Sequence, residues 1–455
     1  MNINETIKSR SLGLKLILVG VLAFVLWIPA MLVYGLVFER STRAEGVKNE
    51  IYELAGGQQT ISGPLIIVPA VIATGKLDKN ETPITRTQYF AFTPQLLNID
   101  TQVTASQRRR SIYDATIYDA DVKMTGHFGP LVPPRLAEGE AHFDWERAVL
   151  AIKFRDDTAL KGIRENLELT INDQLRKAAF EPGISLTVLE DGRGGDNISL
   201  PGVSMALPIT DPTKGFAFDL TLPMSGGGAL YFAPAGEDTT LNMRSNWADP
   251  SFQGAYLPDN REITDDGFSA EWRIPYLARN LPRSFPVEGN LGFLDQGKSF
   301  GVEFVSAASP YKSVNRALKY SLMFLGVVFL TFFLFEATTD ARAHPAQYIL
   351  LGLAQVIFYL MVLAFSEHIG FDAAFALTAS ATVALSGTYA ATVFHSKLRG
   401  IIAFLAFSAA YGLIYLLMKS EDYALLIGSV TAFGAIALTM FVTRRLDWYG
   451  GRDKA

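Results

Sequence analysis

The chain has 455 residues, of which 49% are hydrophobic and only 19% are charged, with a mean hydropathy of +0.21 and a formal net charge of −5. Soluble globular proteins carry about 25% charged residues, so this deficit indicates contact with lipid. The 12% aromatic content excludes disordered and collagen-like chains, and the absence of cysteine excludes disulfide scaffolds, thiolate zinc sites and cysteine nucleophiles. An integral membrane protein with a large water-soluble part remains.

Six apolar stretches have, or approach, the length that crosses a bilayer. A hydrocarbon core of about 30 Å requires about 20 apolar residues in a helix. We therefore predict an α-helical membrane protein with six transmembrane helices, namely an anchor followed much later by a five-helix bundle at 318–443. The stretches are 16–38, 320–335, 345–366, 373–394, 400–418 and 423–443.

The first stretch has two interpretations. A secretory signal peptide has an apolar region of about 7–15 residues and a small-residue cleavage site, whereas this run is 23 residues long and no such site follows it. An uncleaved anchor at 16–38 is therefore favoured. Beyond it Val47, Ile51 and Leu54 fall on one helical face, which predicts a helical extension over 39–58 that Gly56 and Gly57 terminate.

Positive charge in the short loops predicts the orientation of the helices. An even number of spans places both termini on one side, and that side would carry ten basic residues, whereas the opposite short loops carry only Lys419. Because Lys and Arg concentrate in cytoplasmic loops, we expect cytoplasmic termini at 1–15 and 444–455 and an extracytoplasmic segment at 39–319. The ten are Lys8, Arg10, Lys15, Arg342, Lys397, Arg399, Arg444, Arg445, Arg452 and Lys454.

The segment 59–310 has the pattern of a large, mainly-β extracytoplasmic domain between helix 1 and helix 2. Hydrophobic residues alternate with period two at 216–222, 167–171, 268–274 and 300–304, and turn residues separate these runs. Only 156–165 and 172–180 have the pattern of short helices. The pattern leaves open one sheet system or two subdomains with a seam near 192–202.

The outer segment offers few candidate sites. Residues 39–319 contain 29 basic and 36 acidic residues, a net charge of 29 − 36 = −7, which argues against nucleic acid as a partner. Arg108 to Arg110 is interpreted as a solvated turn, with a phosphate or lipid-headgroup contact as the alternative. Residues 190–197 could supply oxygens to calcium but lack the spacing of a known loop, and a metal at His127 or His142 would need further ligands.

Motifs of catalysis and of cofactor binding are absent from the sequence. It contains no H-E-x-x-H, Walker A loop, nucleophile elbow or C-x-x-C. The glycine-rich segment 225–228 follows a predicted strand without the Lys-Ser/Thr of a phosphate loop, which favours a turn or close backbone packing. We therefore predict a protein that is not an enzyme and that has no cofactor.

Ionisable residues in the membrane part lie at the predicted boundaries of spans. Glu336 and His344 flank the loop between spans two and three, and Glu367 and His368 lie at the outer end of span three. Charge near mid-bilayer costs about 2.5–3.5 kcal/mol per residue and usually marks a coupling site, and these spans carry none. A solvated boundary or a local ion pair is the favoured interpretation, and a gating or ligand role is the alternative.

Span four carries small residues at every fourth position. Such a stripe lies on one face of a helix and permits close approach of a neighbouring helix. We therefore predict helix packing along this face, and Gln355 in span three can bond to a neighbour. The stripe is Ala374, Thr378, Thr382, Ser386 and Ala390.

Several short motifs together resemble the CreD family. The resemblance covers essentially the whole chain and implies a Gram-negative inner-membrane protein with a periplasmic domain, linked to cell-envelope integrity and to envelope stress under a two-component system. It implies no catalytic residue, substrate or cofactor. The motifs are 315–320 (NRALKY), 332–336 (FFLFE), 344–348 (HPAQY), 365–371 (FSEHIGF), 62–65 (SGPL), 245–247 (SNW), 250–254 (PSFQG), 443–444 (TR) and 447–449 (DWY).

Three functions are compatible with these observations. The first is a non-enzymatic protein that maintains the cell envelope, whose periplasmic β domain binds an envelope component, either a protein, a lipid or a peptidoglycan precursor. The second is a transporter or flippase-like protein that moves an amphiphile through the bundle, with Glu336, His344, Glu367 and His368 as gating candidates. The third, an enzyme acting on lipid or peptidoglycan precursors, lacks a nucleophile or metal constellation.

Overall fold

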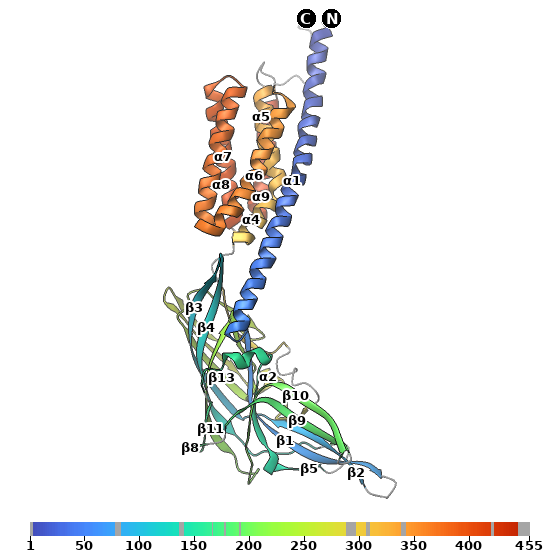
Figure 1. The fold of residues 1–455 in the computed structure, drawn as a ribbon. Coiled ribbons are helices and arrows are strands. Elements are labelled where there is room, and N and C mark those ends of the chain that lie inside the picture. The colour runs from blue at the N-terminus through green and yellow to red at the C-terminus, as the bar shows by residue number, and fades with distance from the viewer. Residues whose placement is uncertain are drawn as a thin grey trace. The chain divides into compact units, whose positions relative to one another are not determined.

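The computed structural model describes ten segments of the chain, which fall into two compact units (Figure 1). A helical unit comprises Met1–Glu45 and Ala308–Ala455, and a β unit comprises Gly46–Ala307. Most of the predicted C-terminal tail, 445–455, and the first two residues lie outside the described part. The described segments are 3–77, 83–135, 141–165, 167–176, 179–190, 193–287, 297–305, 310–337, 343–419 and 423–444.

Seven long helices are described outside the β sheets. Helix α1 begins before the first apolar stretch and continues without interruption past its end, and the other six follow the β strands in the sequence. Consecutive helices α6, α7 and α8 pack against one another as an antiparallel series. The bounds are α1 Ile3–Ala55, α4 Pro310–Lys319, α5 Ser321–Ala337, α6 Pro345–Ile369, α7 Phe371–Val393, α8 Lys397–Lys419 and α9 Ala424–Thr443.

Among the described residues, four helices are long and apolar enough to cross a bilayer: α1, α6, α7 and α8. A fifth span results if α4 and α5, which bend by 56° at Tyr320, are counted together. The apolar part of α9, Leu425–Phe441, is shorter. Helices able to span a membrane are therefore confirmed, but the predicted number of six is not, because the second predicted span is bent and the apolar part of the last is short.

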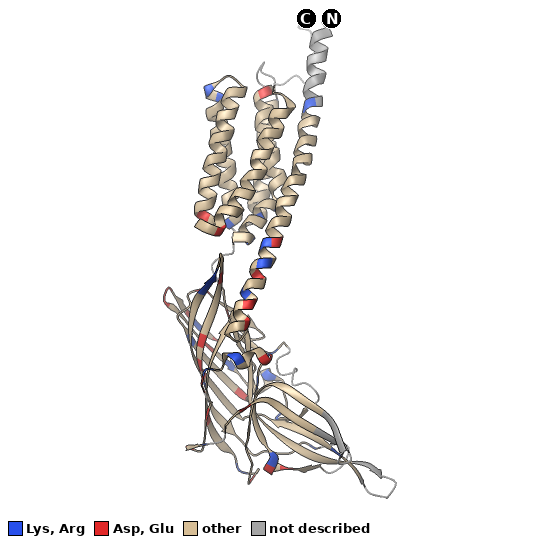
Figure 2. Cartoon of the chain, viewed as in Figure 1, with Lys and Arg blue, Asp and Glu red and all other residues tan. Residues whose placement is uncertain are grey.

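Helices α6, α7 and α8 carry their charged residues near their ends. Figure 2 shows no Lys, Arg, Asp or Glu in the central turns of α6, α7 or α8. Large apolar side chains are exposed along the same helices, for example Leu385 at 59% and Leu405 at 61%. Such a surface is stable where hydrocarbon covers it, because lipid removes the cost of hydrating apolar area.

The β unit consists of two sheets, which confirms the mainly-β prediction. The first has the strand order β14-β18-β12-β1-β6-β10-β9-β2-β17, with β5 pairing β1. Its strands are β1 Gln59–Leu77, β2 Pro83–Phe92, β5 Ala141–Phe143, β6 Val149–Lys153, β9 Glu181–Glu190, β10 Arg193–Ala206, β12 Ala229–Phe232, β14 Pro250–Gly254, β17 Ser284–Val287 and β18 Phe300–Phe304.

The second sheet has eight strands in the order β15-β16-β13-β3-β4-β11-β7-β8. The long hairpin of β3 and β4 forms its centre, and β13 joins β3 in a parallel pairing. Its strands are β3 Leu96–Arg110, β4 Tyr113–Phe128, β7 Glu168–Ile171, β8 Gln174–Leu175, β11 Phe216–Gly227, β13 Asp238–Ser245, β15 Asn260–Thr264 and β16 Gly267–Ile274.

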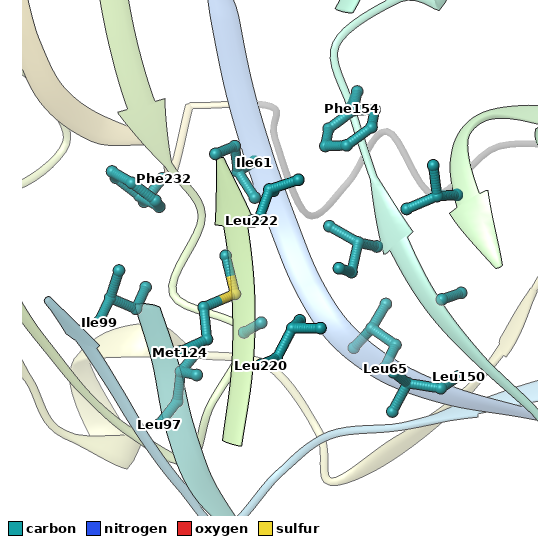
Figure 3. Packing of buried hydrophobic residues seen from close by; sticks show 14 of the residues in the cluster. Ile61, Leu65, Leu97, Ile99, Met124, Leu150, Phe154, Leu220, Leu222 and Phe232 are labelled. Atoms are coloured by element: carbon teal, nitrogen blue, oxygen red, sulfur yellow. The ribbon is translucent and has the colours of Figure 1, made fainter. Parts of the chain in front are cut away.

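One hydrophobic core joins the two sheets. Figure 3 shows side chains from β1 and β6, such as Leu65 and Leu150, together with Met124 and Leu220 from β4 and β11. All four are fully buried. The alternation over 216–222 explains this arrangement, since every second residue of β11 points to the inner face. Burial of each such side chain stabilises the fold by about 1.5–3 kcal/mol.

Two details of the predicted β domain differ from the structure. The pattern at 156–165 forms a short 3₁₀ helix, η2 Asp157–Gly162, which Asp156 caps. The helix predicted over 172–180 is wrong: Asn172 and Asp173 have φ angles of 47° and 62° and make the turn between β7 and β8. Two consecutive residues with positive φ angles form a tight two-residue hairpin turn, a conformation that Asn and Asp favour. Residues 177–178 lie outside the described part.

No subdomain seam separates the β unit near 192–202. Strand β10 continues through Gly202 and pairs with β6 on one side and β9 on the other. The unit is compact as a whole, with one core shared by both sheets. Of the segment considered for calcium, residues 191–192 lie outside the described residues.

The glycine-rich segment 225–228 packs against the last turn of α1. The last turn of α1 places the Tyr52 ring so close to Gly227 that a Cβ there would lie 2.3 Å from Tyr52 Cδ1. Gly228 has a φ angle of 76°, and a Cβ on it would also meet the ring, at 2.9 Å. Only glycine leaves room for this contact, so the segment serves close packing.

Candidate functional site

Glu336 lies in the last turn of α5 and is almost buried, with 8% of the residue exposed. Lys15 of α1 donates to its Oε1 and also to the carbonyl oxygen of Ala343 at 2.8 Å. The Tyr348 hydroxyl of α6 donates to Oε2 at 3.2 Å. Three helices thus meet at one carboxylate, whose two oxygens each have a donor. The neighbouring Asp340 and Arg342 lie outside the described residues.

His344 caps the N-terminus of α6. Its Nδ1 accepts from the backbone N–H of Ala346 at 3.2 Å, and Gln347 Oε1 accepts from the backbone N–H of His344 at 2.8 Å. This reciprocal pair is a capping box with histidine in the place usually taken by serine or threonine. The ring therefore has a local structural partner.

Glu367 and His368 lie in the last turn of α6 and have different surroundings. The Tyr311 hydroxyl of α4 donates to Glu367 Oε1 at 3.0 Å, and Arg40 of α1 approaches Oε2 at 3.8 Å. His368, about 100° further around the helix, is exposed. Glu367 and His344 are separated by about 35 Å of helix. The four gating candidates therefore lie at two opposite ends of α6 and form no common site.

The two carboxylates hold α1 against the helical unit at two levels. Lys15 and Arg40 lie about 38 Å apart along α1, given a rise of about 1.5 Å per residue. The two carboxylates are similarly buried, with side-chain exposure of 8% for Glu336 and 10% for Glu367, but exposure is 21% for Lys15 against 47% for Arg40. A buried pair is costly to break because the remaining charge stays in a poor solvent, whereas an exposed pair contributes little. We therefore expect the Lys15–Glu336 pair to dominate.

The small-residue stripe of α7 is buried along its whole length. Ala374, Thr378 and Ala390 are fully inaccessible, and Thr382 and Ser386 are 6% and 2% exposed. Helices α6 and α8 both pack against α7. The threonine hydroxyls donate back to their own helix, Thr378 to Ala374 and Thr382 to Thr378. The stripe therefore buries polar groups that already have partners.

A polar cluster crosses the centre of α6, α7 and α8. Gln355 of α6 is 1% exposed, and its Oε1 accepts from the Tyr411 hydroxyl of α8 at 2.6 Å. Its Nε2 lies 3.5 Å from Ser386 Oγ of α7. The hydroxyl of Tyr359 is also buried, and none of the described residues offers it a partner. In a membrane, such polar groups link helices because lipid offers no alternative hydrogen bond.

A polar groove crosses the outer face of the eight-stranded sheet, with a cavity volume of about 640 Å³. Side chains from β15, β16, β13 and β3 form one cross-strand row: Asn242 donates to Asp100 at 2.9 Å, and Asn260 donates to Glu271 at 3.2 Å. Arg273 holds the pKa of Glu271 below its ordinary value, with a second bond from Asn260. This first row is therefore internally satisfied.

A second row of the same groove is not satisfied within the protein. It contains Glu262, Arg244, Gln102 and Asp121, which are all exposed. Strand register brings Gln102 opposite both Arg244 and Asp121. Within the described part of the chain, these four side chains make no hydrogen bond or ion pair. They can therefore donate to and accept from a hydrophilic ligand.

The remaining outer candidates do not assemble into a metal site. His127 and His142 are exposed on β4 and β5, and no three metal-ligating side chains gather among the residues that the structure describes. The arginines 108–110 end strand β3 at a hairpin, where Arg110 pairs with Glu50 of α1 at 2.7 Å and Arg109 donates to the Ser111 carbonyl. They lie at an exposed turn.

The hydrogen-bond donors to the candidate residues were not predicted from the sequence. Tyr311, Tyr348 and Tyr411 carry the hydroxyls that reach Glu367, Glu336 and Gln355. Tyr348 and Tyr411 lie in apolar helices and Tyr311 is buried on the amphipathic helix α4, and in such places a tyrosine hydroxyl requires a partner. That requirement was a usable signal, but the sequence alone does not say which helix supplies the acceptor.

Comparison with known proteins adds a family relationship. The family model described as "Inner membrane protein CreD" matches residues 11–449. The Escherichia coli (strain K12) protein named "Inner membrane protein CreD" is 30% identical over 427 residues, which cover 93% of this chain and 91% of that protein. A solved M1 zinc metallopeptidase from Deinococcus radiodurans shares 10% identity over 80% of this chain and 95% of its own, with a TM-score of 0.19 that carries no structural argument.

Unequal burial of the two ion pairs predicts unequal losses. Replacing Lys15 with Met should destabilise the protein by about 2 kcal/mol, because Lys15 is mostly buried and bonds Glu336 directly, whereas Arg40 is exposed and approaches Glu367 only to 3.8 Å. The double variant Lys15→Met/Glu336→Gln should cost less than the sum of its single variants. Arg40→Met is the matched control and should cost at most about 0.5 kcal/mol. Unfolding of the full chain in detergent measures these values, and an equal loss from Arg40→Met would contradict the assignment.

The two buried tyrosines of the polar cluster predict opposite effects of losing a hydroxyl. Tyr411→Phe leaves the Gln355 oxygen without its donor and should destabilise the protein by about 1 kcal/mol. Tyr359→Phe removes a hydroxyl that has no described partner and should be neutral or stabilising. The two substitutions delete the same atom, so the difference in unfolding free energy reports the hydrogen bond. Equal losses would show that the bond contributes nothing.

Proposed function

The chain belongs to the CreD family of inner membrane proteins, and on this basis we propose that it maintains the integrity of the cell envelope without catalysis. In this proposal the β unit lies in the periplasm and binds an envelope component that is a protein, a lipid or a peptidoglycan precursor. The protein acts within an envelope-stress response that a two-component system controls. The membrane part serves to hold the β unit at the inner membrane.

We further propose that the chain crosses the membrane six times, with both termini in the cytoplasm and 39–319 in the periplasm. In this topology α5 forms the second span, α4 lies at its periplasmic end, and α9 forms the last span. The excess of Lys and Arg on one side supports the orientation. The length of α9, 20 residues, is close to the minimum for a span.

The observation that carries the binding proposal is the groove on the eight-stranded sheet. Its row of Glu262, Arg244, Gln102 and Asp121 offers both donors and acceptors, and none of these side chains has a described partner. Replacing exposed residues away from special structural features changes stability by at most about 0.5 kcal/mol. The binding role of the groove can therefore be tested without unfolding the sheet.

The proposed topology predicts a pattern of cysteine labelling, and the chain has no native cysteine to interfere. Single variants place a thiol between α7 and α8 (Ser396→Cys), between α8 and α9 (Ser420→Cys) and at the C-terminus (Ala455→Cys). A membrane-impermeant maleimide added to cells with a permeabilised outer membrane should label only Ser420→Cys. Lysed cells provide the control for reactivity. Labelling of Ala455→Cys in intact cells would mean that α9 does not cross.

Removing charged side chains of the groove should abolish the resistance to envelope stress that the protein confers. The variant Arg244→Ala/Asp121→Ala should lose resistance to envelope stress in cells that lack the native gene, at normal expression and unchanged melting temperature. A photo-crosslinking residue at Gln102 should capture the same component in wild-type protein and lose at least 80% of that product in the double variant.

The matched control removes one basic and one acidic side chain elsewhere on the same sheet. Glu168 on β7 and Arg176 after β8 are exposed, and Glu168→Ala/Arg176→Ala removes one charge of each sign. This control should retain both resistance and crosslinking. If the groove variant keeps full resistance while a chain lacking 59–310 loses it, the β unit acts through another surface.

A further inference from the structure

A second cavity lies in the helical unit, on the outer surface between α6 and α7. Its volume is about 560 Å³, and its walls include Leu350, Leu353 and Met361 from α6 and Leu385 from α7. Exposed leucines line it, with Leu350 at 58% and Leu385 at 59%. Because both helices are long and apolar enough to span a membrane, hydrocarbon is the solvent that this groove meets.

Two hydroxyls of its wall already have partners within the protein, and the wall also includes Tyr389. Thr382 donates to the carbonyl of Thr378 at 2.8 Å, and Ser386 Oγ lies 3.5 Å from Gln355 Nε2. Neither hydroxyl therefore requires a polar group from an occupant. The wall presents a concave hydrocarbon-like surface.

The groove has the depth of one lipid leaflet. Its α6 wall runs from Leu350 to Met361, about 16 Å of helix, and half of a hydrocarbon core of about 30 Å is about 15 Å. It begins one to two turns inside the start of α6 at Pro345 and one turn inside the end of α7 at Val393. It thus extends from one face of the membrane to its middle.

Positive charge gathers at the end of the helices where the groove begins. Lys397 and Arg399 open α8 directly after the end of α7. Among the residues at this end whose side chains are described, four are basic and one is acidic, and the acid, Glu336, is paired with Lys15. Lys397 is exposed and Arg399 half-buried, and neither has a carboxylate partner in the described segments. They are Lys15, Lys397, Arg399, Arg444 and Glu336.

We propose that the groove between α6 and α7 binds one acyl chain of an anionic phospholipid, whose phosphate lies at Lys397 and Arg399. Basic side chains between membrane helices recognise anionic headgroups, and each contributes about fivefold in affinity, from about 1 kcal/mol per residue. The apolar wall alone would accept any acyl chain, and the two cations make the site selective. In the orientation proposed above this is the cytoplasmic leaflet.

Phospholipid retention by the full chain tests this site. Protein purified in mild detergent is mixed with phosphatidylglycerol or with zwitterionic phosphatidylcholine, and bound lipid is counted by native mass spectrometry. Wild-type protein should retain one phosphatidylglycerol with at least tenfold preference. Lys397→Gln/Arg399→Gln should bind about 30-fold or more weakly to phosphatidylglycerol, and its binding of phosphatidylcholine should not change.

Two matched controls separate this site from lipid that merely surrounds the helices. Ala381 lies exposed in the groove and Ala409 exposed on α8, so Ala381→Trp should displace the lipid and Ala409→Trp should not. Arg444 lies at the same end on α9, and Arg444→Gln should leave retention intact. Equal losses in these controls, equal binding of the two lipids, or a protein dimer in place of a lipid adduct would overturn the proposal. None of these measurements depends on the groove of the β unit. A failure of the lipid proposal is therefore distinguishable from a failure of the proposed binding function of the β unit.

Discussion

The helical unit depends on the absence of water from the hydrocarbon core of a membrane. A charged group there has neither hydration nor high dielectric to stabilise it, so charges are confined to helix ends or are paired. The structure follows this constraint: the central turns of α6 to α8 carry no ionised residue, and the nearly buried Glu336 has a donor on each oxygen. The neutral polar groups inside, around Gln355, instead bond between helices.

The same constraint explains how much of the fold was predictable. Hydrocarbon length identifies the apolar helices, and period-two alternation identifies strands such as β11, because both follow from what covers a side chain. The number of spans was not predictable in the same way, since the apolar run gives no sign of the 56° bend between α4 and α5 at Tyr320. The error at Asn172 arose because two left-handed residues make a hairpin turn that a helical pattern of apolar residues had concealed.

The candidate site was less predictable than the fold. Glu336 and Glu367 were recognisable as boundary carboxylates, but their partners Lys15 and Arg40 lie more than 300 residues away in the chain. A contact of that separation depends on the complete tertiary arrangement. The groove of the β unit is hidden for a related reason, because its second row gathers side chains from four strands that the register alone brings together.

The cap of α6 fixes the tautomer of its histidine. The Ala346 N–H bonds to the Nδ1 lone pair of His344, so Nδ1 acts as the acceptor and the ring hydrogen resides on Nε2. A serine or threonine hydroxyl in this place could rotate and still present a lone pair to the same N–H. The two nitrogens of an imidazole have separate roles, so the helix that His344 caps also determines which of them carries the hydrogen.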